Sequence, residues 1–329
     1  MKVVIIGAGV AGLSIGWKLL EGGAEVLILE RAQPARAATW AAAGMIAPTA
    51  ETAHANPDET QFARWSAELW PKFAAEVEEK SGRQIGYRRD GALIVAKSED
   101  EAHQIASQSN RKLLTADEAR AREPLLGGEI AGALWDGEEA QVDSRALGGA
   151  LTHLFVRAGG KLSTNEAAVR IEVGDGRLGV ATPFAVYPAD KVLVAAGAWS
   201  GSIEMDDPVL PPMRPVKGEV LALIPPPGRL PPRQVVWGNG VYLVPREGRL
   251  LIGATMEEVG FDTTLTDKAE NWLTDRAVSL MPSLASWQID EHWAGLRPAS
   301  PDGLPVLGET RVKNLFIASG HFRNGILVA

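Results

Sequence analysis

Residues 3–12 read Val-Val-Ile-Ile-Gly-Ala-Gly-Val-Ala-Gly, a β-branched run that stops at three closely spaced glycines. The run predicts a buried strand, and the glycines predict a tight turn into a helix. Gly7 permits the turn, Gly9 lets a pyrophosphate approach the main chain, and Gly12 lets the helix pack closely on the strand. The N-terminus of such a helix offers unpaired N–H groups and a partial positive charge to phosphates.

The residues that follow complete a strand–turn–helix–strand unit. Leucines at helical spacing give the helix an apolar face, Gly22-Gly23 end it, and residues 25–30 read as a buried parallel strand. Glu30 stands at the end of this strand, where a carboxylate that binds a ribose is expected. The alternative is a glycine-rich turn in an α/β protein that binds no nucleotide, and the agreement of the whole unit argues against it. We therefore predict a dinucleotide-binding domain.

Composition narrows the class of protein. The chain has 329 residues, which favours two domains, and carries 33 basic and 41 acidic residues, a net charge of −8. The basic residues form no cluster or stripe, so we expect no nucleic-acid partner. Without cysteine the chain has no disulfide, thiolate metal site or thioether-linked cofactor, and we expect no metal. The absence of a charged leader and of a long apolar run predicts a soluble, cytoplasmic protein with no membrane partner.

The rest of the chain alternates between helical and strand-rich stretches. Helices are predicted from Asp58, with a kink or a break at Pro71, after the Thr115–Glu118 capping box, after an N-cap at Asp143 or Ser144, and over 267–280. Alternating strands are predicted over 218–224, 234–237, 241–245 and 249–254, and a buried strand over 315–318. The predicted fold class is α/β: a discontinuous Rossmann-like domain with an inserted antiparallel-sheet (α+β) domain.

Three segments together form a recognisable pattern. The first joins the glycine-rich turn to Ala42-Ala43-Gly44-Met45, the second is Trp293-Ala294-Gly295-Leu296-Arg297-Pro298 running into Pro301-Asp302-Gly303-Leu304-Pro305, and the third is Gly320-His321-Phe322-Arg323-Asn324-Gly325-Ile326-Leu327. In this order, and across essentially the whole chain, they resemble the D-amino-acid-oxidase-like flavoenzymes, and most of all the glycine oxidases of thiamine biosynthesis. The third segment is the most specific part of the resemblance.

The resemblance implies FAD, bound without a covalent link. Its pyrophosphate would lie over the glycine turn, its ribose on Glu30 and its flavin ring beside residues 43–45 and 321–327. The implied cofactor-binding residues are Gly7, Gly9, Val10, Ala11, Gly12, Glu30, Arg31, Ala38, Thr39, Ala43, Gly44, Met45, Ala168, Ala196, Gly197, His321, Phe322, Arg323, Asn324, Gly325, Ile326 and Leu327. The expected FAD-binding domain comprises residues 1–82, 142–208 and 295–329, and the expected substrate-binding domain comprises 83–141 and 209–294.

The resemblance also implies an activity. A small amino acid (glycine, sarcosine or a small D-amino acid) would be oxidised to the imino or keto acid by hydride transfer from Cα to FAD, with molecular oxygen as partner and ammonia and hydrogen peroxide as products. Arg297 would hold the substrate carboxylate, because a planar guanidinium fixes both its position and its orientation. Tyr242 and Arg323 would complete the catalytic set, and the family suggests a homo-oligomer.

Three alternatives remain beside this activity. The first is another substrate on the same scaffold, namely another N-methyl amino acid, a larger D-amino acid or proline. A D-amino-acid or N-methyl-amino-acid dehydrogenase would use the same FAD but pass the electrons to an acceptor other than oxygen. A non-catalytic nucleotide-binding module is disfavoured, because it has no need of an arginine and a tyrosine that bind a carboxylate. The sequence does not fix which amino acid is preferred.

The chain departs from the family pattern in two places. Trp40 stands where the family usually has a small hydroxyl residue near FAD, so its effect on the cofactor contacts is open. The family normally continues beyond the position of Ala329 with a proline and a final helix, and we expect the natural chain to continue likewise.

Overall fold

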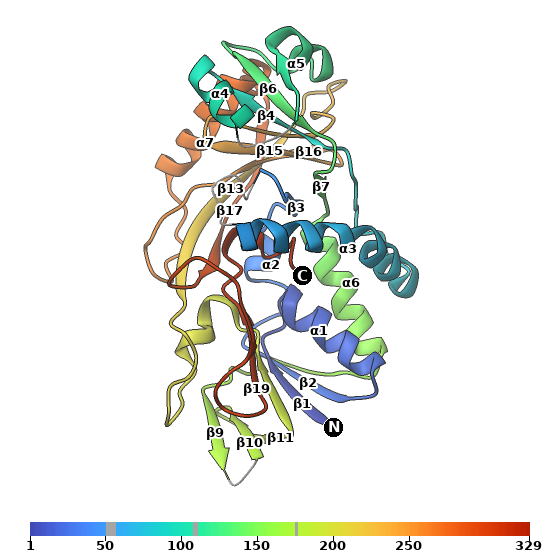
Figure 1. Ribbon diagram of the computed structural model, residues 1–329, viewed down its shortest axis with the longest axis vertical. Coiled ribbons are helices and arrows are strands. Elements are labelled where there is room, and N and C mark those ends of the chain that lie inside the picture. The colour runs from blue at the N-terminus through green and yellow to red at the C-terminus, as the bar shows by residue number, and fades with distance from the viewer. Residues whose placement is uncertain (51–56, 108–110, 175–176) are drawn as a thin grey trace.

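The computed structural model describes residues 1–50, 57–107, 111–174 and 177–329, and two large sheets dominate it, one above the other (Figure 1). The lower sheet follows the order β18 (Val306–Glu309), β19 (Leu315–Ser319), β12 (Lys191–Val194), β1 (Lys2–Ile6), β2 (Glu25–Glu30) and β8 (Lys161–Thr164). Its strand pairs are parallel except that of β18 with β19. The predicted Rossmann-like sheet is therefore confirmed.

The β-branched run of β1 forms the centre of this sheet because both of its faces are covered. Val3 and Ile5 pack under α1 (Val10–Glu21) and α6 (Ser144–Arg157), which lie side by side in Figure 1. Val4 and Ile6 pack on the opposite side. A small antiparallel sheet covers that side, with the order β11 (Val186–Ala189), β10 (Arg177–Ala181) and β9 (Arg170–Gly174).

The upper sheet is largely antiparallel, as predicted. Its order is β17 (Gln288–Ala299), β13 (Arg214–Ile224), β16 (Arg249–Gly253), β15 (Val241–Arg246), β14 (Val235–Gly238), β4 (Ala92–Ala96), β6 (Gly132–Asp136) and β5 (Leu113–Thr115). Only the pair of β14 with β4 is parallel among these pairings of the described residues. Apolar residues of α7 (Asp267–Leu280) bury one face, and the opposite face is directed at the lower sheet.

The remaining elements connect or cover the two sheets. They are α2 (Ala38–Ala41), β3 (Met45–Ile46), α3 (Pro57–Ser81), α4 (Glu99–Ser107), α5 (Ala116–Arg122), β7 (Ala140–Gln141) and three 3₁₀ turns, η1 (Gly197–Ser202), η2 (Pro282–Ser286) and η3 (Phe322–Asn324). The long helix α3 crosses the molecule between the sheets, with the C-terminus beside it (Figure 1). It continues through Pro71 as one helix, so the break that this proline suggested is absent. Among the described residues, no helix is both long and apolar enough to span a membrane.

Strand β17 is the main element that the sequence did not predict. It pairs with β13 from Arg214↔Ala299 to Ile224↔Gln288, with a bulge near Ala222. The expected domain boundary between residues 294 and 295 falls inside this strand, so the segment that carries Arg297 belongs to the upper sheet. The short strands β8, β11 and β18 were also missed. The domain limits therefore stay a prediction.

Candidate active site

The glycine-rich turn lies at the carboxyl end of β1. Gly7 has φ +104°, a conformation that favours glycine, and a Cβ there would lie 2.5 Å from the Ala195 carbonyl oxygen on the neighbouring chain segment. A Cβ at Gly12 would lie 2.0 Å from the Gly7 carbonyl oxygen. At Gly9 the nearest atom would be Thr39 Oγ1 at 3.5 Å, an ordinary van der Waals distance, so protein packing does not require glycine there. Packing requires Gly7 and Gly12, and Gly9 leaves room for a ligand.

Two side chains hold this turn in place. The carboxylate of Glu30 accepts the Ala8 N–H at Oε2 (2.8 Å) and the Ala32 N–H at Oε1 (2.9 Å). The buried hydroxyl of Thr39 accepts the Val10 N–H at 2.9 Å, at the first residue of α1. These bonds bring the carboxylate to the N-terminus of α1, at the sheet edge where dinucleotides bind in such folds.

A cleft of about 960 Å³ lies between the two sheets and has walls from both. Small-molecule sites typically have roughly 300–1,000 Å³, so the cleft is large enough for a cofactor together with a substrate. Most of the predicted site residues line it, namely Gly7, Gly9, Val10, Ala11, Glu30, Arg31, Ala38, Thr39, Ala43, Gly44, Met45, Ala168, Ala196, Gly197, Tyr242, Arg297, His321, Phe322, Arg323, Gly325 and Ile326.

Three predicted cofactor residues do not line the cleft. Gly12 packs against Gly7 on the strand side of α1. Asn324 is buried, and its carbonyl oxygen accepts the Val328 N–H at 3.1 Å. The Leu327 carbonyl oxygen accepts the Trp70 Nε1–H at 2.8 Å. These three residues contact other parts of the protein and are not part of the lining of the cleft.

Several wall residues were not predicted from the sequence. Trp199 lies on η1, where its ring stacks on Phe261 with centroids 5.3 Å apart, and the Arg31 guanidinium lies 4.2 Å from the Trp199 ring centroid. The upper sheet adds Gly218 and Trp237 among others. The position of Trp199 directly after the small residues 195–198 was a signal that could have predicted it. The places of Gly218 and Trp237 in the wall depend on strand register alone.

Arg297 and Tyr242 project from the same face of the upper sheet. Arg297 lies on β17, is half-buried, and donates from Nη1 to the Thr255 carbonyl oxygen at 3.2 Å. Tyr242 lies on β15, and its ring packs edge-on against Trp237 with centroids 5.4 Å apart. The structure therefore brings an arginine and a tyrosine that are distant in sequence into one cleft with the glycine-rich turn.

A buried ionic cluster stands behind Arg297. Lys217 and Glu219 are almost fully buried, with Nζ and Oε1 2.8 Å apart. Burial alone would lower the pKa of Lys217, but the hydrogen bond and charge of Glu219 raise it above its usual value. The Glu219 N–H donates to Thr255 Oγ1 at 2.9 Å, so the cluster fixes the residue whose carbonyl holds Arg297.

His321 and Arg323 belong to the segment after β19. Burial lowers the pKa of the His321 ring to about 4, so the imidazole is neutral near pH 7. Arg323 is exposed and lies at the rim of the cleft. His321 is therefore suited to packing in the wall of the cleft, and of the two residues only Arg323 places a charge at the cleft.

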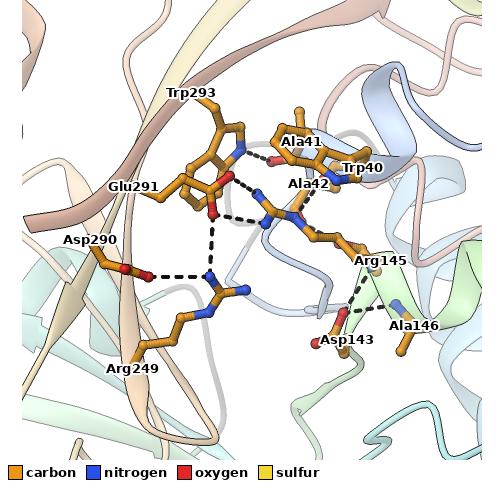
Figure 2. Close-up of polar contacts among 11 residues, drawn as sticks. Trp40, Ala41, Ala42, Asp143, Arg145, Ala146, Arg249, Asp290, Glu291 and Trp293 are labelled. Atoms are coloured by element: carbon orange, nitrogen blue, oxygen red, sulfur yellow. Dashed lines mark hydrogen bonds and ion pairs between the residues drawn. The ribbon is translucent and has the colours of Figure 1, made fainter.

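The Trp40 ring does not line the cleft. It packs edge-on against Trp293 with centroids 6.0 Å apart, and the Arg145 guanidinium lies 3.7 Å from its centroid (Figure 2). The Trp293 Nε1–H donates to the Ala41 carbonyl oxygen at 3.0 Å, which holds the adjacent small-residue segment. The bulk of Trp40 is thus accommodated behind the wall, away from the space for a ligand.

Comparison with known proteins agrees with this arrangement of glycine turn, acidic residue and two-sheet cleft. The profile of the DAO family, described as FAD dependent oxidoreductase, matches residues 2–329. The chain belongs to this family. It is 34% identical to a glycine oxidase of Pseudomonas aeruginosa, over 100% of this chain and 91% of that protein.

Solved structures of the family share the fold. A glycine oxidase from Geobacillus kaustophilus superposes with a TM-score of 0.94 at 33% identity, covering 99% of this chain and 90% of that one. An iminodiacetate oxidase from Chelativorans sp. BNC1 superposes with a TM-score of 0.89 at 28% identity, covering 99% and 91%. The chain is therefore an FAD-dependent oxidoreductase similar to glycine oxidases, as the sequence resemblance predicted.

The residues of the cleft fit the cofactor of this family. A dinucleotide needs a turn without side chains, a helix N-terminus and a carboxylate at the end of the second strand. Gly9, the start of α1 and Glu30 provide these three features at one edge of the lower sheet. Family membership thus implies FAD, and the geometry of the turn is suited to it.

Proposed function

We propose that this protein oxidises a small amino acid (glycine, sarcosine or a small D-amino acid) to the imino acid, with formation of hydrogen peroxide from oxygen. Water then hydrolyses the imino acid to the keto acid and releases ammonia, or methylamine where the substrate is sarcosine. The observation that carries the proposal is the presence of Arg297 and Tyr242 in the same cleft as the glycine-rich turn. The similarity to a glycine oxidase along the whole chain supports it.

Arg297 is proposed to bind the substrate carboxylate. Its guanidinium is half-buried and donates from Nη1 to the Thr255 carbonyl oxygen. A guanidinium has five N–H donors, so the fork keeps further N–H groups for a ligand. Tyr242 is proposed to donate its hydroxyl to the same carboxylate. A planar fork and a hydroxyl from a second direction would fix the substrate's Cα relative to the ring of the cofactor.

FAD, when bound, supplies the redox chemistry by accepting a hydride from Cα and passing the electrons on. The proposed FAD contacts are the predicted cofactor-binding residues that line the cleft, and Glu30 is proposed to bind the ribose. Arg323 is proposed to place positive charge at the rim near the reduced ring. Because the pKa of His321 is lowered to about 4, that ring is not proposed as a base. No cysteine is present for a covalent flavin link.

The test is a substrate panel on the purified yellow protein. Glycine, sarcosine and D-alanine are added anaerobically, and flavin bleaching is recorded; air is then admitted, and peroxide is measured. Bleaching without peroxide would favour a dehydrogenase that uses another acceptor. No bleaching by any amino acid would contradict the proposal.

The variant Arg297→Leu sharpens this test. We expect it to weaken substrate binding by about 2–5 kcal/mol, as in the loss of one partner from a buried charge pair. Arg311→Leu is the matched control, since Arg311 is exposed and its ion pair with Asp207 lies outside the cleft. Unchanged turnover in Arg297→Leu would contradict the proposed role. Homo-oligomeric assembly and a role in thiamine biosynthesis stay predictions from the resemblance, and a cytoplasmic location stays a prediction from the sequence.

A further inference from the structure

The two proposed substrate-binding side chains come from strands that are not neighbours. Arg297 lies on β17 and Tyr242 on β15, and the sheet places β13 and β16 between them. Three strand spacings of roughly 4.8 Å separate the two strands by about 14 Å across the sheet. Register places Tyr242 level with Val220, about 13 Å further along β13 than Val216, which stands opposite Arg297. A carboxylate is far smaller than this gap. The two side chains can therefore meet one carboxylate only if both extend inward across the intervening strands.

Strand register shows which positions lie beneath them. Tyr242 stands opposite Gly253, and Gly253 stands opposite Val220. Arg297 stands opposite Val216, two residues from Gly218 on the same face of β13. The two positions crossed by the side chains are thus both glycine.

The contacts at these glycines are closer than any side chain allows. A Cβ at Gly218 would lie 2.2 Å from Arg297 Nη1 and 2.5 Å from Nη2, so the guanidinium lies directly on the backbone. A Cβ at Gly253 would lie 2.3 Å from Tyr242 Oη and 2.4 Å from two carbons of its ring. Neither glycine has a positive φ, so no left-handed backbone conformation requires glycine at either position.

We propose that Gly218 and Gly253 are positioning residues of the substrate site. The absence of their side chains lets Arg297 and Tyr242 lie across β13 and β16 and converge on one carboxylate. This inference rests on the proposed function, and it assigns the geometry of carboxylate binding to two residues that act through Arg297 and Tyr242.

The two substitutions differ in what must move. In Gly218→Ala the obstructed atoms are the guanidinium end of the flexible Arg297 side chain. This side chain can adopt another rotamer with little loss of protein stability, but the guanidinium then loses its orientation toward the substrate. In Gly253→Ala the obstructed atoms belong to a rigid ring, which must tilt as a whole. Gly174→Ala is the matched control, because Gly174 also lies in a strand without positive φ, and its nearest neighbour would be 4.0 Å away.

The experiment measures binding without turnover. Glycolate, the hydroxyl analogue of glycine, is titrated into the FAD-loaded protein, and its Kd is read from the change in flavin absorbance. We expect Kd to rise by about tenfold or more in Gly218→Ala and Gly253→Ala, because a misplacement of about 1 Å is costly at such sites. The thermal midpoint and the FAD Kd of Gly218→Ala should match those of Gly174→Ala.

A double-mutant cycle separates positioning from general damage. In the Arg297→Lys background no planar fork remains to be displaced, so adding Gly218→Ala should change the glycolate Kd by less than about threefold. An additive effect would overturn the inference, and so would wild-type glycolate affinity in both glycine variants. A wild-type flavin that amino acids do not reduce and glycolate does not perturb would instead overturn the proposed function, and this inference with it.

Discussion

Arg145 and Glu291 join α6 to the upper sheet through a two-pronged ion pair, with Nη1 2.8 Å from Oε2 and Nη2 2.9 Å from Oε1 (Figure 2). Arg145 lies in the first turn of α6, and Glu291 lies on β17, the strand that also carries Arg297. Arg249 approaches the same carboxylate at 3.2 Å. The pair thus ties the nucleotide-binding part of the molecule to the strand of the proposed substrate arginine.

Removing one partner of this pair should reduce stability. The two side chains are 24% and 29% exposed, so the pair is intermediate between a surface pair and a fully buried one. Surface pairs contribute under about 1 kcal/mol, and breaking a buried pair costs more. We therefore expect Glu291→Gln to lower the free energy of unfolding by about 1–2 kcal/mol. Urea unfolding measures this cost. Glu138→Gln is the control, because Glu138 is 65% exposed and also pairs with arginines. An equal decrease in the free energy of unfolding in the two variants would show that the Arg145–Glu291 pair stabilises the protein no more than an exposed pair does.

The same pair predicts a dependence on acid. The hydrogen bond from Arg145 is the largest influence and holds the pKa of Glu291 below its usual value of 4.5. The pair therefore stabilises the fold above about pH 4.5, and this stability is lost as the pH falls through the lower folded-state pKa. The unfolding free energy of Glu291→Gln should fall less steeply below this pH than that of the unsubstituted protein. Parallel curves would contradict the prediction.

Trp40→Ser restores a small hydroxyl residue at a position where the family pattern has one. Because the Trp40 ring supports Arg145 and does not line the cleft, we expect a loss of about 1 kcal/mol in stability, the scale of a partly buried cation–π contact. The flavin absorbance and the FAD Kd should stay unchanged. Thermal unfolding and FAD titration of the apoprotein test both points. A large change in FAD affinity would mean that Trp40 reaches the cofactor.

Glu30→Gln should weaken FAD binding. Both carboxylate oxygens of Glu30 accept backbone N–H groups, and a Gln amide nitrogen would place a donor against one of those donors. Hydrogen bonds to a charged group are worth about 1.5–3 kcal/mol, so the FAD Kd should rise about tenfold to a hundredfold. Quenching of flavin fluorescence measures it. The control is Glu172→Gln in β9 of the small antiparallel sheet, which should bind FAD with unchanged affinity.

His321 predicts a loss of stability in mild acid. Its pKa falls from 6.5 to about 4 on folding because the ring is buried. Above pH 6.5 the ring is neutral in both the folded and the unfolded protein. Between pH 6.5 and about 4 only the unfolded chain takes up the proton, so the free energy of unfolding decreases as the pH is lowered. Below about pH 4 both states are protonated, and the loss levels off. One pKa unit is about 1.4 kcal/mol, so the loss reaches up to about 3 kcal/mol. His321→Asn should remove this part of the curve. The pH dependence of the unfolding free energy measures it, and an unchanged slope would exclude His321 as its source.

Local signals in the sequence were sufficient for several elements. The capping box of Thr115 and Glu118 and the helix over 267–280 were predicted and are present, and of the two predicted caps Asp143 and Ser144 the structure has Asp143. Each of these features depends on residues within one or two helical turns. Strand β17 was missed because its first half is Gln-Ile-Asp-Glu-His, whose charged side chains find partners only on other elements.

The sequence by itself determined the nucleotide-binding turn, the family and the α/β class, since a glycine spacing between an apolar strand and a helix is a property of adjacent residues. Only the tertiary structure decided that the Trp40 ring lies behind the cleft wall and that Arg297 and Tyr242 each cross a glycine. The register between strands distant in the chain determines which side chains share a face and what lies beneath them. That register depends on pairing across the whole sheet, which adjacent residues alone do not encode.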